Sequence, residues 1–360
     1  MLIYCVIALG LCSSTLFGMS PRSAQLEVCG TLRKEYNQEY IQHMLQDPEA
    51  CFFCDPNVLS TNYILYESYE NNIRVMINKY PHFDFDQGYH LLIMPISHKG
   101  STTDFSKEEL MSLAKVIHDY SGKLYPTAYS QEFFMNWGSV AGQSIPHGHG
   151  QFKSYVKPPQ SLSEQLQAEK NSYITNIEDA YAALKVVLNS DYGKITPDVI
   201  VYGNEKCDCC AVENNEMMDE INLVIGRFKY NYVCLSHYPS MPAEISIVPN
   251  QHVSALKDLP LDALQENMIL SIALLSIVEE YAQKNIFECG GSSLYIKSIG
   301  AKTSNVEKSK YHVHTVVTPR TKMQPTLGAF SGNSFKLDID PVHFAEYLKA
   351  KVDYLKELVV

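Results

Sequence analysis

Short apolar runs rich in β-branched residues predict the strands of the first half of the chain. Ile73–Ile77 and His90–Pro95 are two such runs, and Tyr80-Pro81 between them breaks any continuous element. Phe133–Met135 and Ile145–Phe152 predict two further strands. The first half is therefore predicted to be rich in β-structure.

An amphipathic helix is predicted between the second and third of these strands. Ser106 is a good N-cap residue, and Glu109 stands three positions later, as in a capping box. Apolar residues then recur at helical spacing, namely Leu110, Leu113, Ala114 and Ile117.

The same succession of patterns occurs a second time after residue 200. A long apolar helix, Asp262–Gln283, takes the place of the first helix. The other matched segments, second copy against first, are Cys207–Cys210 with Cys51–Cys54, Leu235–Pro239 with Ile77–Pro81, Ile245–His252 with Leu91–His98, and Tyr311–Val316 with Pro146–Gln151. The chain is thus predicted to contain an internal duplication.

The duplication divides the chain into four parts. Residues 1–24 are an apolar N-terminal segment, either a signal or the product of a mis-assigned start. Residues 25–152 form the first half, and residues 153–200 form a connector that is mostly helical. Residues 201–360 form the second half with a C-terminal tail.

Composition and charge exclude several classes of protein. Hydrophobic residues make up 46% of the 360 residues and charged residues 19%, which is typical of a globular chain. The net charge is −11 without a long Lys/Arg run, so no nucleic-acid partner is expected. Met268–Val278 is too short for a membrane span and fits a buried helix, so no membrane partner is expected either.

Cysteine spacing favours metal binding over disulfides. Of the ten cysteines, several fall as Cys51-x-x-Cys54 and Cys207-x-Cys209-Cys210, which points to a reducing compartment. Met1–Gly18 is apolar but lacks a basic region before it, and Met19 is an alternative start. We expect a cytoplasmic protein, and the apolar N-terminus leaves a secreted form open.

Candidate chemistry concentrates in Asn136–Phe152, which reads Asn-Trp-Gly-Ser-Val-Ala-Gly-Gln-Ser-Ile-Pro-His-Gly-His-Gly-Gln-Phe. In an extended strand His147, His149 and Gln151 would share one face. The small and amide-bearing residues before them let a backbone approach an anion and offer it donors. A neutral imidazole can attack phosphorus and form a phosphoramidate, so the segment suits phosphate chemistry.

This string resembles the signature of the histidine-triad (HIT) superfamily, and its His-x-His-x-Gln ending is similar to the nucleotidyltransferase branch, the galactose-1-phosphate uridylyltransferases. The resemblance implies an α+β fold of two tandem HIT-like half-domains, each a mostly antiparallel β-sheet with flanking helices. It also implies that the first half is catalytic. The second half has Val316 where the first has Gln151, so its active site is expected to be degenerate.

The resemblance implies a ping-pong transfer through a covalent nucleotidyl-histidine. His149 would attack the α-phosphorus of the donor, while Gln151 and Ser144 would donate hydrogen bonds to the phosphoryl oxygens. The expected substrate-binding residues are Asn136, Gly142, Gln143 and Lys322. A leaving phosphate ester is a weak base, so the neutral amide of Gln151 suffices where other leaving groups need a general acid.

Zinc prefers four tetrahedral thiolate and imidazole ligands. Cys51, Cys54, His98 and His147 can supply that set, and the resemblance supports it as a structural zinc site that steadies the strand carrying His149. The internal repeat offers a second set, with Cys209 and His314 as competing ligands; it consists of Cys207, Cys210, His252 and His312. Lys297 stands where the family's own second metal would require a histidine.

The leading hypothesis is a hexose-1-phosphate uridylyltransferase, which exchanges UDP-glucose with galactose 1-phosphate and binds a nucleotide sugar and a sugar phosphate. One alternative is a phosphorylase of dinucleoside polyphosphates or nucleotide sugars, which would take phosphate as acceptor. Another, of a different class, is an inactive zinc-stabilised nucleotide-binding module. The tandem halves already mimic a dimer, so either a monomeric pseudo-dimer or a homodimer is expected.

Overall fold

The structure is a computed structural model. It describes residues 51–55, 64–157, 181–189, 224–321 and 340–360, with gaps at 79–80, 82, 84–86, 139–140, 144, 182–183, 186–187, 237–242, 286–288, 304, 306–307 and 309–310. The expectations for residues 1–24 and for most of the connector lie outside the described residues.

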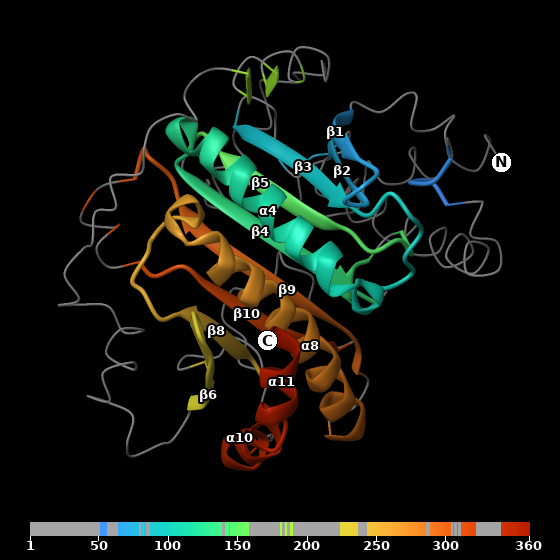
Figure 1. Cartoon of the computed structure of the whole chain (residues 1–360), viewed down its shortest axis with the longest axis vertical. Coiled ribbons are helices and arrows are strands. Elements are labelled where there is room, and N and C mark those ends of the chain that lie inside the picture. Colours follow the sequence, from blue (N-terminus) through green and yellow to red (C-terminus); the bar gives the residue numbers. More distant parts are fainter. Residues whose placement is uncertain are drawn as a thin grey trace, which may run out of the picture.

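Both halves contribute to one ten-stranded antiparallel sheet, in which the strand order is β1-β2-β3-β5-β4-β9-β10-β8-β7-β6 (Figure 1). The first half supplies β1 (Ile64–Ser68), β2 (Ile73–Ile77), β3 (Gly88–Met94), β4 (Ser130–Trp137) and β5 (Gly150–Tyr155). The second supplies β6 (Val224–Arg227), β7 (Asn231–Leu235), β8 (Ile245–Pro249), β9 (Cys289–Ile299) and β10 (His314–Thr321). The predicted α+β class and mostly antiparallel pairing are confirmed.

The strand order reads the same from either edge, with each first-half strand matched by its second-half counterpart. The two halves join where β4 pairs with β9, and there Phe134 lies opposite Tyr295. Gln151 pairs with Phe134, and Val316 pairs with Tyr295 in the same way. An approximate two-fold axis therefore passes through the Phe134–Tyr295 pair, and it relates residues 146–155 to residues 311–320.

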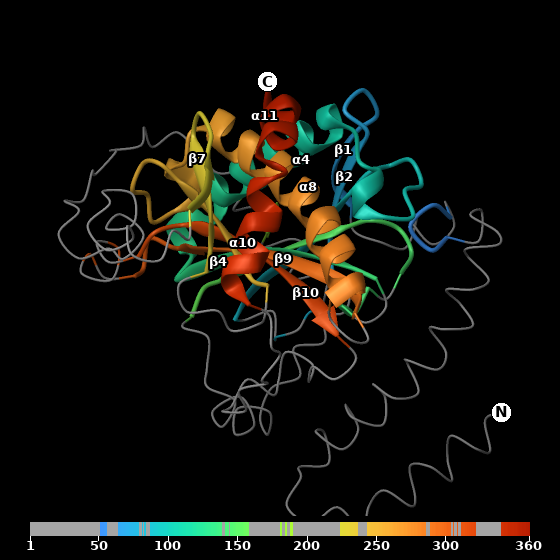
Figure 2. The same ribbon diagram turned by 90° about the horizontal axis from the view of Figure 1, so that it is seen from below.

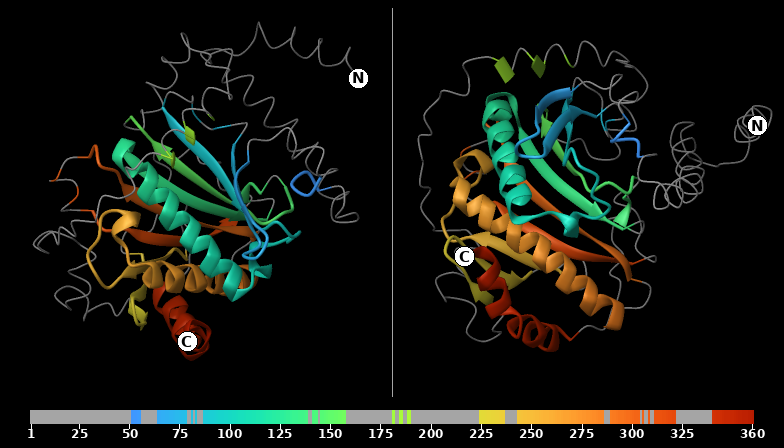
Figure 3. Two further views of the ribbon diagram at one scale, coloured as in Figure 1. Left: turned by 45° about the horizontal axis from the view of Figure 1, so that its top comes forward. Right: turned by 45° about the vertical axis from the view of Figure 1, so that its right-hand side comes forward.

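The helices lie on one side of the sheet (Figures 2 and 3). They are α4 (Lys107–Leu124), α8 (Leu261–Asn285), α10 (Pro341–Lys349) and α11 (Val352–Val359), and α4 packs against α8. Short 3-10 turns are η2 (Thr102–Asp104), η3 (Tyr125–Thr127) and η6 (Leu256–Asp258). Leu261–Lys284 is long and apolar enough to cross a membrane by length and composition alone, but most of it is buried here, and packing against the sheet accounts for its apolarity.

The predicted capping box of the first helix is present. The Ser106 hydroxyl accepts from the Glu109 N–H, and the Glu109 carboxylate accepts from the Ser106 N–H. The four predicted apolar positions, Leu110, Leu113, Ala114 and Ile117, are all buried. Capping and periodicity are local properties, which is why the sequence was sufficient for this element.

Side-chain alternation gives the sheet two chemically different faces. Phe133 and Phe152 are fully buried in the core beneath the helices. Their neighbours along the strands, Phe134 and Gln151, point to the opposite face. That face, which we call the open face, carries the charged side chains of the central strands, namely Glu132, Lys153, Lys297 and Arg320.

Candidate active site and metal centre

Four predicted ligands come together beside β5. One ligand atom from each of Cys51, Cys54, His98 and His147 lies within 4.8 Å of the others. Cys51 and Cys54 belong to a tight turn, in which the Cys54 N–H donates to the Cys51 carbonyl at 2.9 Å. His98 follows β3, and His147 precedes β5. Residues from three separate segments thus form a Cys₂His₂ cluster that could bind a metal.

Hydrogen bonding aims the His147 ring at the thiols. Nε2 of His147 donates to the Pro95 carbonyl at 3.0 Å, so Nδ1 keeps its lone pair. Nδ1 lies 3.4 Å from the Cys51 Sγ and 3.5 Å from the Cys54 Sγ, and the His98 Nδ1 lies 3.6 Å from the Cys54 Sγ. A tetrahedral ion with bonds of about 2.0–2.3 Å separates its ligands by roughly 3.3–3.8 Å. These three donor pairs therefore have the spacing such an ion requires, and all four donors lie within 4.8 Å of one another.

The protonation of the cluster depends on burial. Burial lowers the pKa of His147 to about 3, so the ring is neutral, as a metal ligand must be. Burial, and then the neighbouring Cys51, raises the pKa of the Cys54 thiol to about 12. A bound cation would favour the thiolate and release the proton, so metal affinity should rise with pH.

His149 is held with its reactive nitrogen available. Its Nδ1 donates to the His147 carbonyl at 2.7 Å, which leaves the lone pair on Nε2. The ring is nine-tenths buried and lies 5.4 Å from the Phe53 ring. Burial lowers the pKa of His149, so its imidazole is neutral and nucleophilic at physiological pH. His147 thus contributes its ring to the Cys₂His₂ cluster and its carbonyl to His149.

Gln151 is oriented by His90, a residue that sequence reasoning missed. The fully buried His90 donates from Nε2 to the Gln151 Oε1 at 2.8 Å. Asn78 lies beside the same ring, with its Nδ2 3.4 Å from Nδ1 of His90, where the lone pair accepts. Because the Gln151 Oε1 accepts this bond from His90, the amide N–H groups of Gln151 point away from His90 and can donate to another group. No motif links His90 to Gln151; only the pairing of β3 with β5 brings them together.

The second half also contributes to this region. Ser293 on β9 donates from its hydroxyl to the Asn136 Oδ1 at 2.9 Å, and the Arg320 Nε donates to the Ser293 oxygen at 3.1 Å. Arg320 is nine-tenths buried, and burial lowers its pKa while leaving it charged. No motif or spacing pointed to Ser293 or Arg320. A chain of donors therefore runs from a buried cation to Asn136, one of the predicted substrate residues.

The structure describes some of the other predicted site residues, including Gly142 and Gln143. Gly142 has a φ of 91°, a left-handed conformation that favours glycine, and an added Cβ would lie 3.9 Å from the Asn136 Nδ2. The buried Gln143 accepts from the Gly138 N–H at 2.9 Å through its side-chain oxygen, which braces the turn. Ser144 and Lys322 lie outside the described residues.

One local expectation was wrong. The predicted strand Ile145–Phe152 begins only at Gly150, so His147 and His149 precede β5. The backbone N–H groups of this segment bond outside the sheet: that of His147 donates to Ile145, and that of Gly148 donates to the Lys99 carbonyl at 2.6 Å. The segment that carries His147 and Gly148 packs on the loop after β3 instead of pairing in the sheet, and this turns His147 toward the thiols.

The two glycines that flank His149 permit close packing. A Cβ at Gly148 would lie 2.8 Å from the Phe105 ring, and one at Gly150 would lie 2.4 Å from the buried Phe133 ring. Both distances are below van der Waals contact, so a side chain at either position would push the motif away from the core.

We expect Gly150→Ala to lower the free energy of unfolding by about 1–3 kcal/mol, because overpacking forces the Phe133 ring or the strand to move. Chemical denaturation measures this loss. Gly100→Ala is the matched control, since its Cβ would meet no atom closer than 4.0 Å. Equal stability of the two variants would contradict the tight packing of the motif.

The second half reproduces part of this arrangement. His314 donates from Nδ1 to the His312 carbonyl at 2.9 Å, as His149 does to His147. The rings of His252 and His312 lie 4.9 Å apart, close to the 5.1 Å between the rings of His98 and His147. Cys207 and Cys210, the other members of the predicted second metal set, lie outside the described residues.

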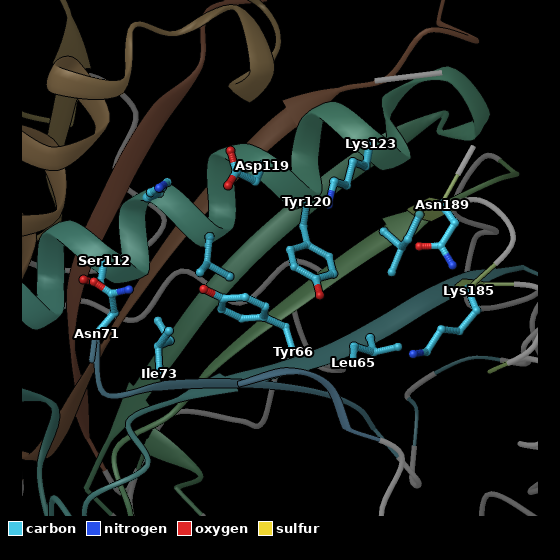
Figure 4. A pocket seen from close by; sticks show the side chains of 13 residues that line it. Leu65, Tyr66, Asn71, Ile73, Ser112, Asp119, Tyr120, Lys123, Lys185 and Asn189 are labelled. Carbon is cyan, nitrogen blue, oxygen red and sulfur yellow. The ribbon is translucent and has the colours of Figure 1, made fainter. Parts of the chain in front are cut away.

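A pocket of about 220 Å³ lies on the helix side of the sheet, between α4, β1 and the helical residues of 181–189 (Figure 4). The rings of Tyr66 and Tyr120 face one another across it, and Lys123 and Lys185 stand at one end. Phe152 and the other core residues separate it from His149, which lies at the open face. This pocket is therefore not part of the candidate active site.

Solved structures show what this fold is similar to. A GalT-like protein from Arabidopsis thaliana aligns with a TM-score of 0.57 at 16% identity, covering 83% of this chain and 91% of that one. A uridylyltransferase aligns with a TM-score of 0.56 at 17% identity, covering 84% and 91%. An ADP-glucose phosphorylase from Arabidopsis thaliana, solved with bound ADP-glucose, aligns with a TM-score of 0.57 at 16% identity, covering 83% and 90%.

No protein-family model and no curated protein matches the sequence. The structural similarity nevertheless extends over most of each chain and includes both halves. The chain therefore has the GalT-like fold of two HIT-type halves, as the sequence resemblance implied.

Proposed function

We propose that this protein is a nucleotidyltransferase that works through a covalent nucleotidyl-histidine at His149. The observation that carries the proposal is the 2.7 Å bond from the His149 Nδ1 to the His147 carbonyl. It fixes the tautomer and leaves the lone pair on a neutral Nε2, which is the requirement for attack on phosphorus. The GalT-like fold and the uridylyltransferase and phosphorylase neighbours support the same reaction class.

In the first step a bond forms between the His149 Nε2 and the α-phosphorus of the donor. The bond from that phosphorus to the leaving phosphate ester breaks, and the electron pair stays with the leaving group. In the second step an acceptor phosphate attacks the same phosphorus and displaces the histidine. The Gln151 amide, oriented by His90, donates to the phosphoryl oxygens as negative charge builds.

Arg320 supplies positive charge close to the reacting groups. Through Ser293 it polarises Asn136, whose Oδ1 is already engaged, so that the Asn136 Nδ2 is left to donate to a phosphate oxygen. Buried arginine retains its charge and pairs well with phosphate. We assign this donor chain to the binding of the diphosphate or the acceptor phosphate.

We propose zinc for the Cys₂His₂ cluster, because two thiolates and two imidazoles at this spacing form a closed tetrahedral set. The ion would take no part in the reaction and would fix His147, and with it the carbonyl that orients His149. By the internal repeat, Cys207 and Cys210 would complete a second site with His252 and His312, whose rings are already adjacent.

For the substrates we propose a nucleotide sugar as donor and a hexose 1-phosphate as acceptor, which makes the enzyme a UDP-glucose–hexose-1-phosphate uridylyltransferase. A nucleotide-sugar phosphorylase uses the same residues with inorganic phosphate as acceptor. The similarity to the ADP-glucose phosphorylase supports this second candidate at an equal TM-score.

The test is intact-protein mass spectrometry after incubation with UDP-glucose, ADP-glucose, GDP-glucose or diadenosine tetraphosphate. We expect an acid-labile mass gain of one nucleotidyl group with one preferred donor, which names the base. Adding galactose 1-phosphate or inorganic phosphate to the isolated intermediate should discharge it, and the faster acceptor names the reaction. If no donor labels protein that binds nucleotide, the covalent mechanism is wrong.

A further inference from the structure

The open face carries a second pocket, about 560 Å³ in volume, at the ends of β4 and β9 that lie away from His149. It is lined by Tyr129, Glu132, Tyr155, Lys297 and Tyr311, together with smaller residues of the same strands and of the loop after β9. We call this the second-half pocket. None of its lining residues belongs to the candidate active site.

The approximate two-fold axis places the second-half pocket where the second half would have its active site. Rotation about the Phe134–Tyr295 pair takes Asn136 to Lys297, because each lies two residues further along its strand and points to the open face. It takes His149 to His314, whose ring is held by the same carbonyl contact. Strand spacing and rise put these two histidines roughly 20 Å apart.

The chemistry at the two positions differs. Val316 occupies the place of Gln151 and has no hydrogen-bond donor to offer a transferring phosphoryl group. Lys297 occupies the place of Asn136, so a neutral amide is replaced by a cation. The second-half pocket has therefore lost a group that assists transfer and gained one that attracts anions.

Lys297 lies opposite Glu132 in the β4–β9 register, and its ammonium is 5.4 Å from the centre of the Tyr295 ring. Glu132 accepts from the Tyr155 hydroxyl at 3.4 Å and lies 3.8 Å from the Lys153 Nζ. Lys153 is nine-tenths buried, with its ammonium 4.5 Å from the centre of the Phe134 ring. Among the ion pairs of the described residues none involves Lys297, and its exposed side chain borders the pocket. Two lysines against one carboxylate make this site net positive in a chain of net charge −11.

The remaining walls suit an aromatic group. Tyr129, Tyr155 and Tyr311 contribute ring surface, and all three are half-buried. Nucleic bases stack on such rings with little dependence on their identity. The volume is also within the range of small-molecule sites, roughly 300–1,000 Å³.

We propose that the second-half pocket is a second nucleotide site, which binds a nucleoside phosphate without reacting with it. The tyrosines would take the base, and Lys297, backed by Lys153, would take the phosphate. The structure thus assigns a binding role to the half that lacks Gln151. This site does not require His149 to be catalytic.

The test counts nucleotides bound by the full-length protein. In the His149→Ala background, which rules out covalent capture at His149, equilibrium dialysis with UMP or AMP is expected to show two sites per chain. Lys297→Glu should weaken one of them at least tenfold and leave the other unchanged. Lys356→Glu makes the same charge change on α11, on the far side of the sheet, and should change neither site.

The base and phosphate contributions are separated by the choice of ligand and variant. Ribose 5-phosphate and inorganic phosphate should bind the second site at least tenfold more weakly than UMP or AMP, and Tyr311→Ala should weaken the nucleotide by about tenfold. Nucleotide binding that Lys297→Glu does not weaken, whether at one site or at two, would overturn the proposal. A single site that Lys297→Glu does weaken would instead contradict nucleotide binding at the candidate active site. Equal binding of inorganic phosphate and UMP would overturn the assignment of the tyrosines to a base.

Discussion

Replacing His149 by alanine should remove covalent nucleotide capture and lower the rate of nucleotidyl transfer by about 10³-fold or more. Alanine has no nitrogen to form the phosphoramidate. Of the other described imidazoles of the first half, His98 and His147 belong to the Cys₂His₂ cluster, His90 is engaged with Gln151, and His118 lies on α4 across the sheet. The measurement combines intact-protein mass spectrometry with steady-state transfer rates for the donor that labels the wild type.

His343→Ala is the matched control for that experiment. His343 is exposed on α10, across the sheet from the open face, so its loss should change neither labelling nor rate. Nucleotide affinity of the His149→Ala variant should stay within a few-fold of the wild type, because the phosphate donors Gln151 and Asn136 remain. Labelling that persists in this variant would assign the nucleophile to another residue.

Loss of one cluster thiol should release a metal ion and destabilise the first half. We expect Cys54→Ala to lower the metal content by one ion per chain and the free energy of unfolding by about 3 kcal/mol or more, because metal binding energy is folding energy. The melting temperature should fall by about 5 °C or more. Elemental analysis and thermal denaturation measure the two effects.

Cys234→Ala controls for the removal of a buried thiol as such. Cys234 packs with Tyr232 and Val248 on β7 and β8, far from the cluster. Its substitution should leave the metal content unchanged and cost about 1 kcal/mol. An unaltered metal content in Cys54→Ala would show that the four donors do not form a metal site.

The metal prediction extends to activity through His147. Its carbonyl is the acceptor that fixes the His149 tautomer, and its ring belongs to the Cys₂His₂ cluster. If the ion only steadies this residue, Cys54→Ala should slow the transfer without changing which donor labels His149. The cluster and the nucleophile are thus coupled through one backbone unit.

Several parts of the fold were predictable because they depend on neighbours in the sequence. The capping box at Ser106 and the apolar stripe of α4 are local, and both are present as predicted. The internal repeat was visible as matched patterns, and it reappears as a strand order that reads alike from either edge. The strand boundary before Gly150 was missed because the backbone partner of Gly148 is Lys99, some fifty residues away.

Some residues of the candidate site could be found from the sequence, and others only from the structure. The His-x-His-x-Gln motif and its family resemblance pointed to His149 and Gln151 as candidates, and zinc-ligand chemistry together with the same resemblance pointed to the Cys₂His₂ set. His90, Ser293 and Arg320 escaped detection, since none stands near the motif along the chain. Each reaches it by strand pairing, through β3 or through β9 and β10.

Local sequence was thus sufficient for most of the secondary structure and for the duplication, and its motif supplied the candidate nucleophile, because propensity, periodicity and residue chemistry act over a few positions. The joining of β4 to β9 was decided only when the two halves packed into one sheet. That pairing sets the register, and the register places Arg320 near the candidate active site and Lys297 at the corresponding position of the second half. Such long-range pairing depends on the burial of a shared core, to which residues hundreds of positions apart contribute at once.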